Sequence, residues 1–306
     1  MSVRMGISMG AQIGGAERFR EWLALCEDSA LDSVWASDRL ISREPSFEPV
    51  TTAAMVAGAT KRIKFGFNAL TLPLRDPVTL AKECATIDHL SGGRLLPVFG
   101  IGINKGPEWK ATGRDPKGRG ARANEALEIM ARLWSEESVS YEGAHFQLRE
   151  ASISPRPVQQ PLPIWVGGSS QAAIERTARL GTGWIGGLQP ADRVGPVIDA
   201  IKRRASDLGR TIDPDHYGAT VLVRLGSADD AALGPFAKQV KKLGLGSAES
   251  LVTVGCARDI IDRIRQLNDA GASKFVAVPM ASDSDDVLLQ TRRLIDEVVP
   301  EVHAIG

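Results

Sequence analysis

Short apolar segments alternate with segments of helical periodicity from one end of the chain to the other. The apolar segments lie at residues 5–9, 33–37, 63–70, 95–101, 164–166, 183–185, 217–225 and 274–278. Most of them are nearly continuous apolar runs, which is typical of strands in a parallel sheet with both faces covered. Eight strand–helix units in succession predict an α/β fold, a closed (β/α)8 barrel of the TIM type.

An open, doubly wound parallel sheet is the alternative architecture for the same alternation of elements. It is favoured when the first unit carries the dinucleotide fingerprint GxGxxG, which residues 9–15 do not contain. The length of 306 residues suits one large barrel, since such barrels span about 250 residues as a single domain. We therefore predict one domain over residues 1–306.

Two stretches interrupt the alternation and are expected to be insertions on barrel loops, at about residues 139–162 and about residues 226–255. The first contains a predicted hairpin around Glu142 and Gly143, followed by a proline-rich segment. The second is rich in Gly, Ala and Lys, and could serve as a lid or substrate wall or simply pack against the barrel.

The charges of the chain balance, because 37 Lys and Arg residues stand against 37 Asp and Glu residues. A net charge of zero removes any general attraction to nucleic acid or to an anionic membrane surface. No apolar run approaches the roughly 20 residues that a membrane-spanning helix needs. Residues 1–15 also lack the pattern of a secretory signal. These features predict a cytoplasmic protein with no nucleic-acid or membrane partner.

Cysteine and histidine form no recognisable ligand motif. Cys26, Cys84 and Cys256 form no CxxC pair and lie among apolar residues, so we expect three buried free thiols. The four histidines have no metal-ligand spacing to one another or to a cysteine, so no metal site is expected.

The residues that follow the predicted strands are the candidate functional residues, because the active sites of such barrels lie at the carboxyl ends of the strands. The fifth strand is followed by Gly167, Gly168, Ser169 and Ser170 and then by a helix. The glycines allow close approach to the backbone, and the free N–H groups of the helix start favour an anion or phosphate. The alternative is an ordinary glycine turn with a serine cap, and position alone leaves both open.

Two other strand ends carry polar side chains. The fourth is followed by a glycine-rich segment with Asn104 and Lys105, which matches neither GxGxxG nor a Walker motif. The second ends in Ser37, Asp38 and Arg39, where an acid and a base either orient a ligand or pair with each other.

Several motifs taken together resemble the bacterial luciferase-like monooxygenase superfamily, and within it the probable F420-dependent oxidoreductases. They lie in order over nearly the whole chain, at residues 32–38, 72–78, 80–95, 100–104, 119–127, 163–169 and 269–272. The run over residues 80–95 is the most specific, and it ends in Ile87-Asp88-His89-Leu90-Ser91-Gly92-Gly93-Arg94-Leu95. The resemblance implies a (β/α)8 barrel that binds a flavin or deazaflavin at its mouth, usually as a homodimer or larger homo-oligomer.

The resemblance also implies roles for individual residues. The phosphate of the coenzyme is expected at Gly167, Gly168, Ser169 and Ser170. The Asn68–Ala69 bond falls where the family often has a non-prolyl cis peptide that pushes a bulge against the ring. The residues expected to line the ring or the substrate are Ile101, Asn104, Ser37 and Asp38.

Arg39 departs from the pattern of several relatives. Members that oxidise alcohols or sugars have a histidine immediately after the aspartate of this motif, as proton acceptor, where this chain has Arg39 after Asp38. Arginine stays protonated and is no general base at neutral pH. We therefore do not expect an alcohol or sugar-phosphate dehydrogenase. Asp38 and Arg39 remain the candidate catalytic residues, with Arg39 expected to hold an anionic group of the substrate or coenzyme.

Three functions are consistent with these features. The first is an oxidoreductase that transfers hydride between coenzyme F420 and a small organic substrate. The second is a monooxygenase that uses oxygen and reduced FMN supplied by a partner reductase. The third is a non-catalytic ligand-binding barrel, which would bind no flavin tightly.

Overall fold

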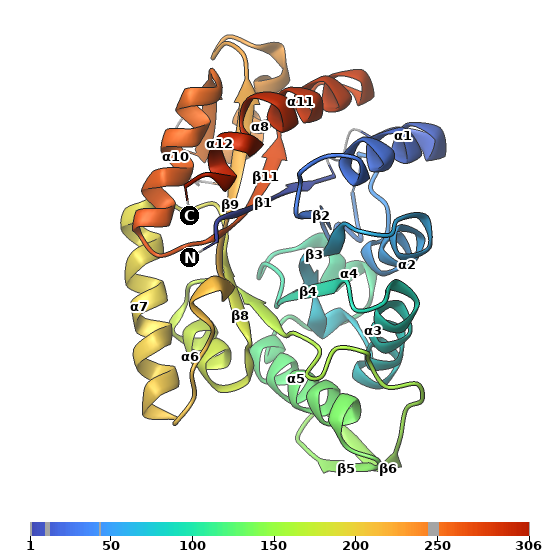
Figure 1. Ribbon diagram of the computed structural model, residues 1–306. Helices are drawn as coiled ribbons and strands as arrows, with labels where there is room; N and C mark the ends of the chain where they lie inside the picture. The colour runs from blue at the N-terminus through green and yellow to red at the C-terminus, as the bar shows by residue number, and fades with distance from the viewer. Residues whose placement is uncertain (1, 10–12, 43, 244–250, 306) are drawn as a thin grey trace.

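The eight predicted strands are all present and close into a parallel barrel in the computed structural model, which describes residues 2–9, 13–42, 44–243 and 251–305 (Figure 1). Their bounds are β1 Arg4–Ser8, β2 Ser33–Ala36, β3 Lys64–Thr71, β4 Leu95–Gly100, β7 Trp165–Gly167, β8 Gly183–Gly186, β9 Tyr217–Leu225 and β11 Lys274–Pro279. They follow one another in the order β9-β11-β1-β2-β3-β4-β7-β8, and β8 pairs with β9 to close the ring. The predicted (β/α)8 barrel is confirmed, and the open sheet is wrong.

Helices surround the barrel, as Figure 1 shows. The α-helices are α1 Gly15–Glu27, α2 Pro49–Ala59, α3 Pro77–Ser91, α4 Pro107–Ala111, α5 Arg119–Ser135, α6 Gln171–Leu180, α7 Ala191–Asp207, α8 Gly234–Leu243, α10 Ala257–Asp269, α11 Ser284–Glu297 and α12 Val299–His303. The 3₁₀ helices are η1 Leu72–Leu74, η2 Pro214–His216 and η3 Ala231–Leu233. Within the described ranges, no helix has both the length and the apolar composition needed to cross a membrane.

The start and end of α3 show how the sequence sets these elements. The Asp76 carboxylate accepts a hydrogen bond from the Thr79 N–H at 2.8 Å, and Pro77 occupies the first turn. Gly92 ends the helix in the left-handed conformation, with φ +67°.

The two interruptions lie at opposite ends of the barrel. Strands β5 Val139–Glu142 and β6 Gln147–Ala151 pair as the predicted antiparallel hairpin. They connect α5 to β7, so they lie at the end opposite the mouth. The second interruption follows β9 and so lies at the mouth; its residues 244–250 fall outside the described part of the chain.

One strand was not predicted. Strand β10 Val252–Gly255 runs parallel to β9 and pairs with it from Leu222 to Leu225. The same edge of β9 pairs with β8 lower down, from Tyr217 to Ala219. The second interruption therefore adds a strand to the barrel wall at the mouth.

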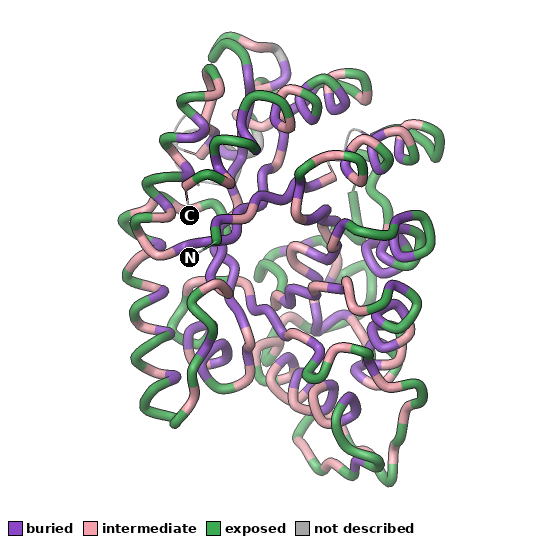
Figure 2. Tube along the Cα trace, viewed as in Figure 1, coloured by how far each residue is buried: buried purple, intermediate pink, exposed green. Residues whose placement is uncertain are grey.

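The barrel interior holds its own small core, separate from the larger core between strands and helices. Its buried side chains are Trp35, Val98, Trp165, Ile185 and Val276. Figure 2 shows the barrel strands largely in the colour of buried residues. These side chains form a floor beneath the mouth.

Glycines on the neighbouring strands make room for the indole of Trp35. A Cβ atom at Gly6 would lie 2.7 Å from Nε1 of Trp35, and one at Gly66 would lie 3.0 Å from its Cζ3. Trp35 can therefore lie inside the barrel only because both neighbours lack a side chain.

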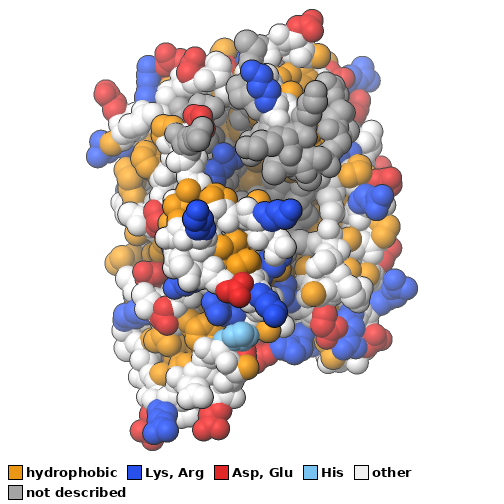
Figure 3. Space-filling view, turned by 180° about the vertical axis from the view of Figure 1, so that it is seen from behind, with side chains coloured by type: hydrophobic (Ala, Val, Ile, Leu, Met, Phe, Trp, Pro, Cys, Tyr) orange, Lys and Arg blue, Asp and Glu red, His pale blue; other side chains and the backbone are white. Residues whose placement is uncertain are grey.

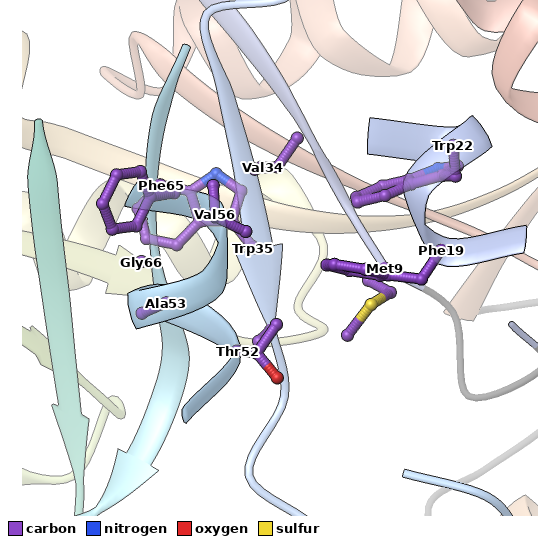
Figure 4. A pocket seen from close by; sticks show the side chains of 11 residues that line it. Met9, Phe19, Trp22, Val34, Trp35, Thr52, Ala53, Val56, Phe65 and Gly66 are labelled. Carbon is purple, nitrogen blue, oxygen red and sulfur yellow. The ribbon is translucent and has the colours of Figure 1, made fainter. Parts of the chain in front are cut away.

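A crevice outside the barrel is a packing feature and not a ligand site. Figure 4 shows Phe19 and Trp22 of α1 on one side and Ala53 and Val56 of α2 on the other. The free volume is about 10 Å³, which is room for about one water molecule.

The expectation of three buried thiols is wrong for one of them. Cys26 and Cys84 are buried, and burial raises the pKa of both thiols well above the ordinary range. Cys256 is exposed, because it lies outside the apolar face of α10, at the N-cap of that helix.

Candidate functional site

A cavity of about 420 Å³ opens where the barrel strands end. Seven predicted site residues line it: Ser37, Arg39, Asn68, Ala69, Ile101, Gly167 and Gly168. Lining residues that sequence reasoning did not select include Ser8, Gly187, Leu188, Thr220, Leu222 and Val278. Most of the lining residues are small, whereas the floor beneath them contains the large side chains of Trp35 and Trp165. The cavity is open because the small lining residues leave the space above this floor unfilled.

A bulge of β3 protrudes into this cavity. The pairing of β3 with β4 shifts register between Phe67 and Leu70, and the Asn68–Ala69 peptide bond is cis, as predicted. A Cβ at Gly100 or Gly167 would lie 3.4 or 3.6 Å from Cβ of Ala69, so Ala69 sits over two positions without side chains.

A hydrogen bond across the barrel holds the bulge. Nδ2 of Asn68 donates to Oγ1 of Thr220 on β9 at 2.9 Å. In the order of the strands, β9 lies four steps from β3 around a ring of eight, so this bond joins opposite walls. Thr220 was not selected from the sequence, since it lies within a strand and not after one.

The loop after β7 is held by several neighbouring groups. Gly168 has φ +106°, a conformation that favours glycine, and its carbonyl accepts a hydrogen bond from Nε1 of Trp184 at 2.7 Å. Ser170 is the N-cap of α6, where its hydroxyl accepts from the Ala173 N–H at 3.3 Å. Ser169 therefore takes no part in capping α6. Neither Ser169 nor Ser170 lines the cavity.

Gln189 supports this loop and was missed by sequence reasoning. Its Nε2 donates to Oγ of Ser169 at 2.6 Å, and its main-chain carbonyl accepts from Nη2 of Arg263 at 2.9 Å. Its Oε1 is buried without a hydrogen-bond partner among the described residues. The available signal was its position three residues after β8, the sixth strand of the prediction, in a loop at the carboxyl end of that strand.

Asp38 does not line the cavity, although it was expected beside the ring or substrate. Its side chain is 2% exposed, and its oxygens accept from Nη2 of Arg75 at 3.2 Å and from the Thr71 N–H at 2.9 Å. The partner of Asp38 is therefore Arg75 and not Arg39. Arg75 also pairs with Glu48 at 2.7 Å. Burial lowers the pKa of Arg75, but the two carboxylates outweigh it and raise that pKa.

Arg39 and Asn104 lie in different surroundings. Arg39 is exposed, lines the cavity and has no recorded ion pair or hydrogen bond among the described residues. Asn104 lies outside the cavity lining, and its Oδ1 accepts from Nη1 of Arg119 at 3.0 Å. No cluster of three or more metal-ligating side chains occurs in the part of the chain that the structure describes.

The face of the molecule shown in Figure 3 has no large area of side chains of one charge. On the face opposite to that of Figure 1, Lys and Arg side chains are interspersed with Asp, Glu and apolar side chains (Figure 3). This mixture agrees with the balanced charge of the sequence.

Comparison with known proteins gives one family. The model of the luciferase-like monooxygenases matches residues 2–244. The F420-dependent glucose-6-phosphate dehydrogenase of Amycolatopsis mediterranei (strain U-32) is 26% identical, with 99% of this chain and 100% of the relative covered. The FMNH(2)-dependent dimethylsulfone monooxygenase of Pseudomonas putida is also 26% identical, with 76% of this chain and 67% of the relative covered.

A solved structure has the same fold. It is an F420-dependent secondary alcohol dehydrogenase in complex with an F420–acetone adduct, with a TM-score of 0.86, 18% identity and 99% of each chain covered. The resemblance found in the sequence motifs is confirmed by the family match over most of the chain. This chain belongs to the luciferase-like monooxygenase family.

Proposed function

We propose that the protein is an oxidoreductase that uses coenzyme F420 and transfers hydride between the deazaflavin and a small organic substrate. The observation that carries this proposal is the placement of the Gly167–Gly168 turn and the Ala69 bulge on one cavity wall. F420-dependent relatives that cover the chain end to end favour the deazaflavin. When bound, the deazaflavin supplies the hydride chemistry, and the protein supplies position and shielding from water.

The residues around the cavity fit such a coenzyme. A volume of about 420 Å³ lies in the range of cofactor and ligand pockets. Ala69 and Ile101 offer apolar contact to a ring, and the bare backbone at Gly167 and Gly168 allows close approach of a phosphate. Oγ of Ser169 accepts its hydrogen bond from Gln189, which leaves the hydroxyl proton free to donate to a phosphate oxygen.

Arg39 and Asp38 have different roles in this proposal. Arg39 contributes positive charge at the cavity wall, as an arginine side chain does. Asp38 is a positioning residue, since its contacts with Arg75 and Thr71 fix the end of β2 that carries Arg39. Neither residue is a proton acceptor here, so we propose a reaction that needs no side-chain base at this position.

Calorimetric titration with F420 and, in parallel, with FMN tests the proposal. We expect F420 to bind and Gly168→Val to abolish that binding, while the circular dichroism of the variant stays that of the wild type. Gly113→Val is the matched control, because Gly113 also has a positive φ, +65°, but lies outside the cavity lining. Unchanged binding in Gly168→Val would contradict the assignment of the phosphate.

The second candidate is a two-component monooxygenase that takes reduced FMN from a reductase. The similarity to the FMNH(2)-dependent dimethylsulfone monooxygenase favours it. Preference for FMN over F420, with oxygen-dependent turnover, would replace the first proposal by this one. If the protein binds neither coenzyme, the non-catalytic ligand-binding barrel is the remaining candidate. A homodimer or larger assembly in the cytoplasm stays a prediction, which light scattering and cell fractionation test.

A further inference from the structure

A second hollow adjoins the cavity on the side of β1, β2 and β11. Its free volume is about 50 Å³, and it shares Ser37, Arg39 and Val278 with the main cavity. Apolar side chains make up most of its remaining wall, notably Met9 and Phe47. The space therefore suits the end of an apolar group next to a cation, with the rest of that group in the main cavity.

Arg39 is the one charged residue among the described residues that line either space. Three acidic side chains near the strand ends are already paired. Asp38 binds Arg75, and Asp230 and Asp286 both bind Arg224, so no recorded carboxylate neutralises Arg39. A cation beside apolar walls attracts an anion more strongly than it would in open water.

The position of Arg39 in the ring of strands shows which molecule brings that anion. The proposed phosphate loop follows β7, whereas Arg39 follows β2, and β3 and β4 lie between them. A coenzyme with its phosphate at Gly168 and its ring against Ala69 would be held by the loop after β7 and by β3, and neither contact involves Arg39. Its phosphate would then lie on one side of the mouth, which leaves Arg39 for a second molecule on the other side.

We propose that the substrate is a small carboxylate with an apolar body, whose carboxylate pairs with the Arg39 guanidinium and whose apolar end enters the hollow beside Phe47. This inference rests on the proposed coenzyme site. A single guanidinium matches a carboxylate, because its fork donates two parallel hydrogen bonds to the two oxygens. The apolar wall disfavours a more highly charged or extensively hydroxylated substrate.

Calorimetry with phenylacetate and its neutral analogue phenylacetamide tests the proposal, on protein with and without coenzyme. We expect the wild type to bind phenylacetate about three- to tenfold more tightly than the amide, because solvent screens part of the attraction of the exposed Arg39. Arg39→Met should remove that preference, and Arg39→Lys should keep part of it. Lys105→Met is the matched control, since Lys105 is a mouth-loop cation outside the lining of both spaces.

The outcomes separate the two proposals. If F420 binds but phenylacetate and phenylacetamide bind equally, the substrate class is wrong and the coenzyme proposal stands. If Arg39→Met weakens F420 as strongly as phenylacetate, Arg39 holds the coenzyme and the substrate class is again wrong. If neither coenzyme binds, the proposed function fails, and the titration of coenzyme-free protein still decides whether Arg39 selects a carboxylate.

Discussion

The Asp38 carboxylate and the Arg75 guanidinium approach to 3.2 Å and join the end of β2 to the segment that follows β3. Arg75 also reaches Glu48, the N-cap of α2, so one guanidinium links three parts of the mouth. None of these three side chains lines the cavity. Their contacts instead stabilise the loop that carries Arg39.

Replacing Arg75 by Met should lower stability without removing a group from the cavity. Asp38 is 2% exposed and would be left as a buried charge without its cation, which typically costs about 3–5 kcal/mol. Urea unfolding measures the loss. Arg265→Met, which removes an exposed i,i+3 pair with Asp262, should leave the midpoint unchanged. Equal midpoints for the two variants would show that Asp38 does not depend on Arg75.

A second buried pair makes stability depend on pH. Lys274 is buried below the floor and pairs with Asp32. Burial is the larger influence and lowers the pKa of Lys274 from 10.5 to about 8, against the raising effect of Asp32. Because the unfolded chain keeps this proton to a higher pH, this lysine makes stability rise as the pH increases from about 8 to about 10.5.

Asp32→Asn should therefore destabilise the protein most at neutral pH. The ammonium of Lys274 then lacks its counterion, at a cost of about 3–5 kcal/mol, and the deficit should shrink as the pH rises above about 8 and the lysine loses its proton. Unfolding curves at about pH 7 and about pH 9.5 measure it. The double variant Asp32→Asn/Lys274→Met should recover much of the loss. A deficit that is the same at both pH values would contradict the assigned pair.

Gln189 should matter only for ligands that carry a phosphate. Gln189→Leu removes the donor to Ser169, so the hydroxyl no longer keeps its direction, and we expect F420 to bind about three- to tenfold more weakly. A deazaflavin with the same ring but no phosphate serves as the control and should bind as it does to the wild type. A parallel loss for this control would mean that Gln189 supports the ring site or the fold instead.

Two glycine-to-alanine changes should have opposite effects on stability. A Cβ at Gly66 would lie 1.8 Å from the carbonyl oxygen of Leu96, so Gly66→Ala should cost about 3 kcal/mol or more. Gly58 is exposed within α2 and has open space around it, so Gly58→Ala should add about 0.5–1 kcal/mol. Thermal unfolding compares both with the wild type, and a Gly66→Ala protein of normal stability would contradict the close approach of Gly66 to the Leu96 carbonyl.

The fold was predictable because the barrel strands carry a strong local signal. Parallel strands buried on both faces are continuous apolar runs, and β9 was predicted with its observed bounds. Strand β10 also has β-branched residues, at Val252, Thr253 and Val254, but its surroundings rich in Gly and Lys suggested an insertion. Whether such a short run pairs depends on the free edge of β9, which no local pattern encodes.

Residues that line the cavity could be predicted from their position directly after a strand. The side-chain contacts that support the cavity could not be predicted from the sequence. Gly167 and Gly168 line the cavity because of where they follow β7. Asp38 turns to Arg75, which is 37 residues later in the chain, and Gln189 reaches Ser169 across 20 residues. These contacts depend on which strand ends become neighbours in the closed ring, so they follow from tertiary structure alone.

The floor of the barrel gives the molecule an optical property. Trp35 and Trp165 are buried in the inner core that forms the floor of the cavity, so a flavin-type ring that enters the cavity would lie above two indoles. Entry of such a ring should dim the emission of the protein with no added label. Trp134 lies at the far end of α5, outside this inner core, and its light should change less. The floor of the cavity thus also provides a fluorescence signal for the binding of a coenzyme ring.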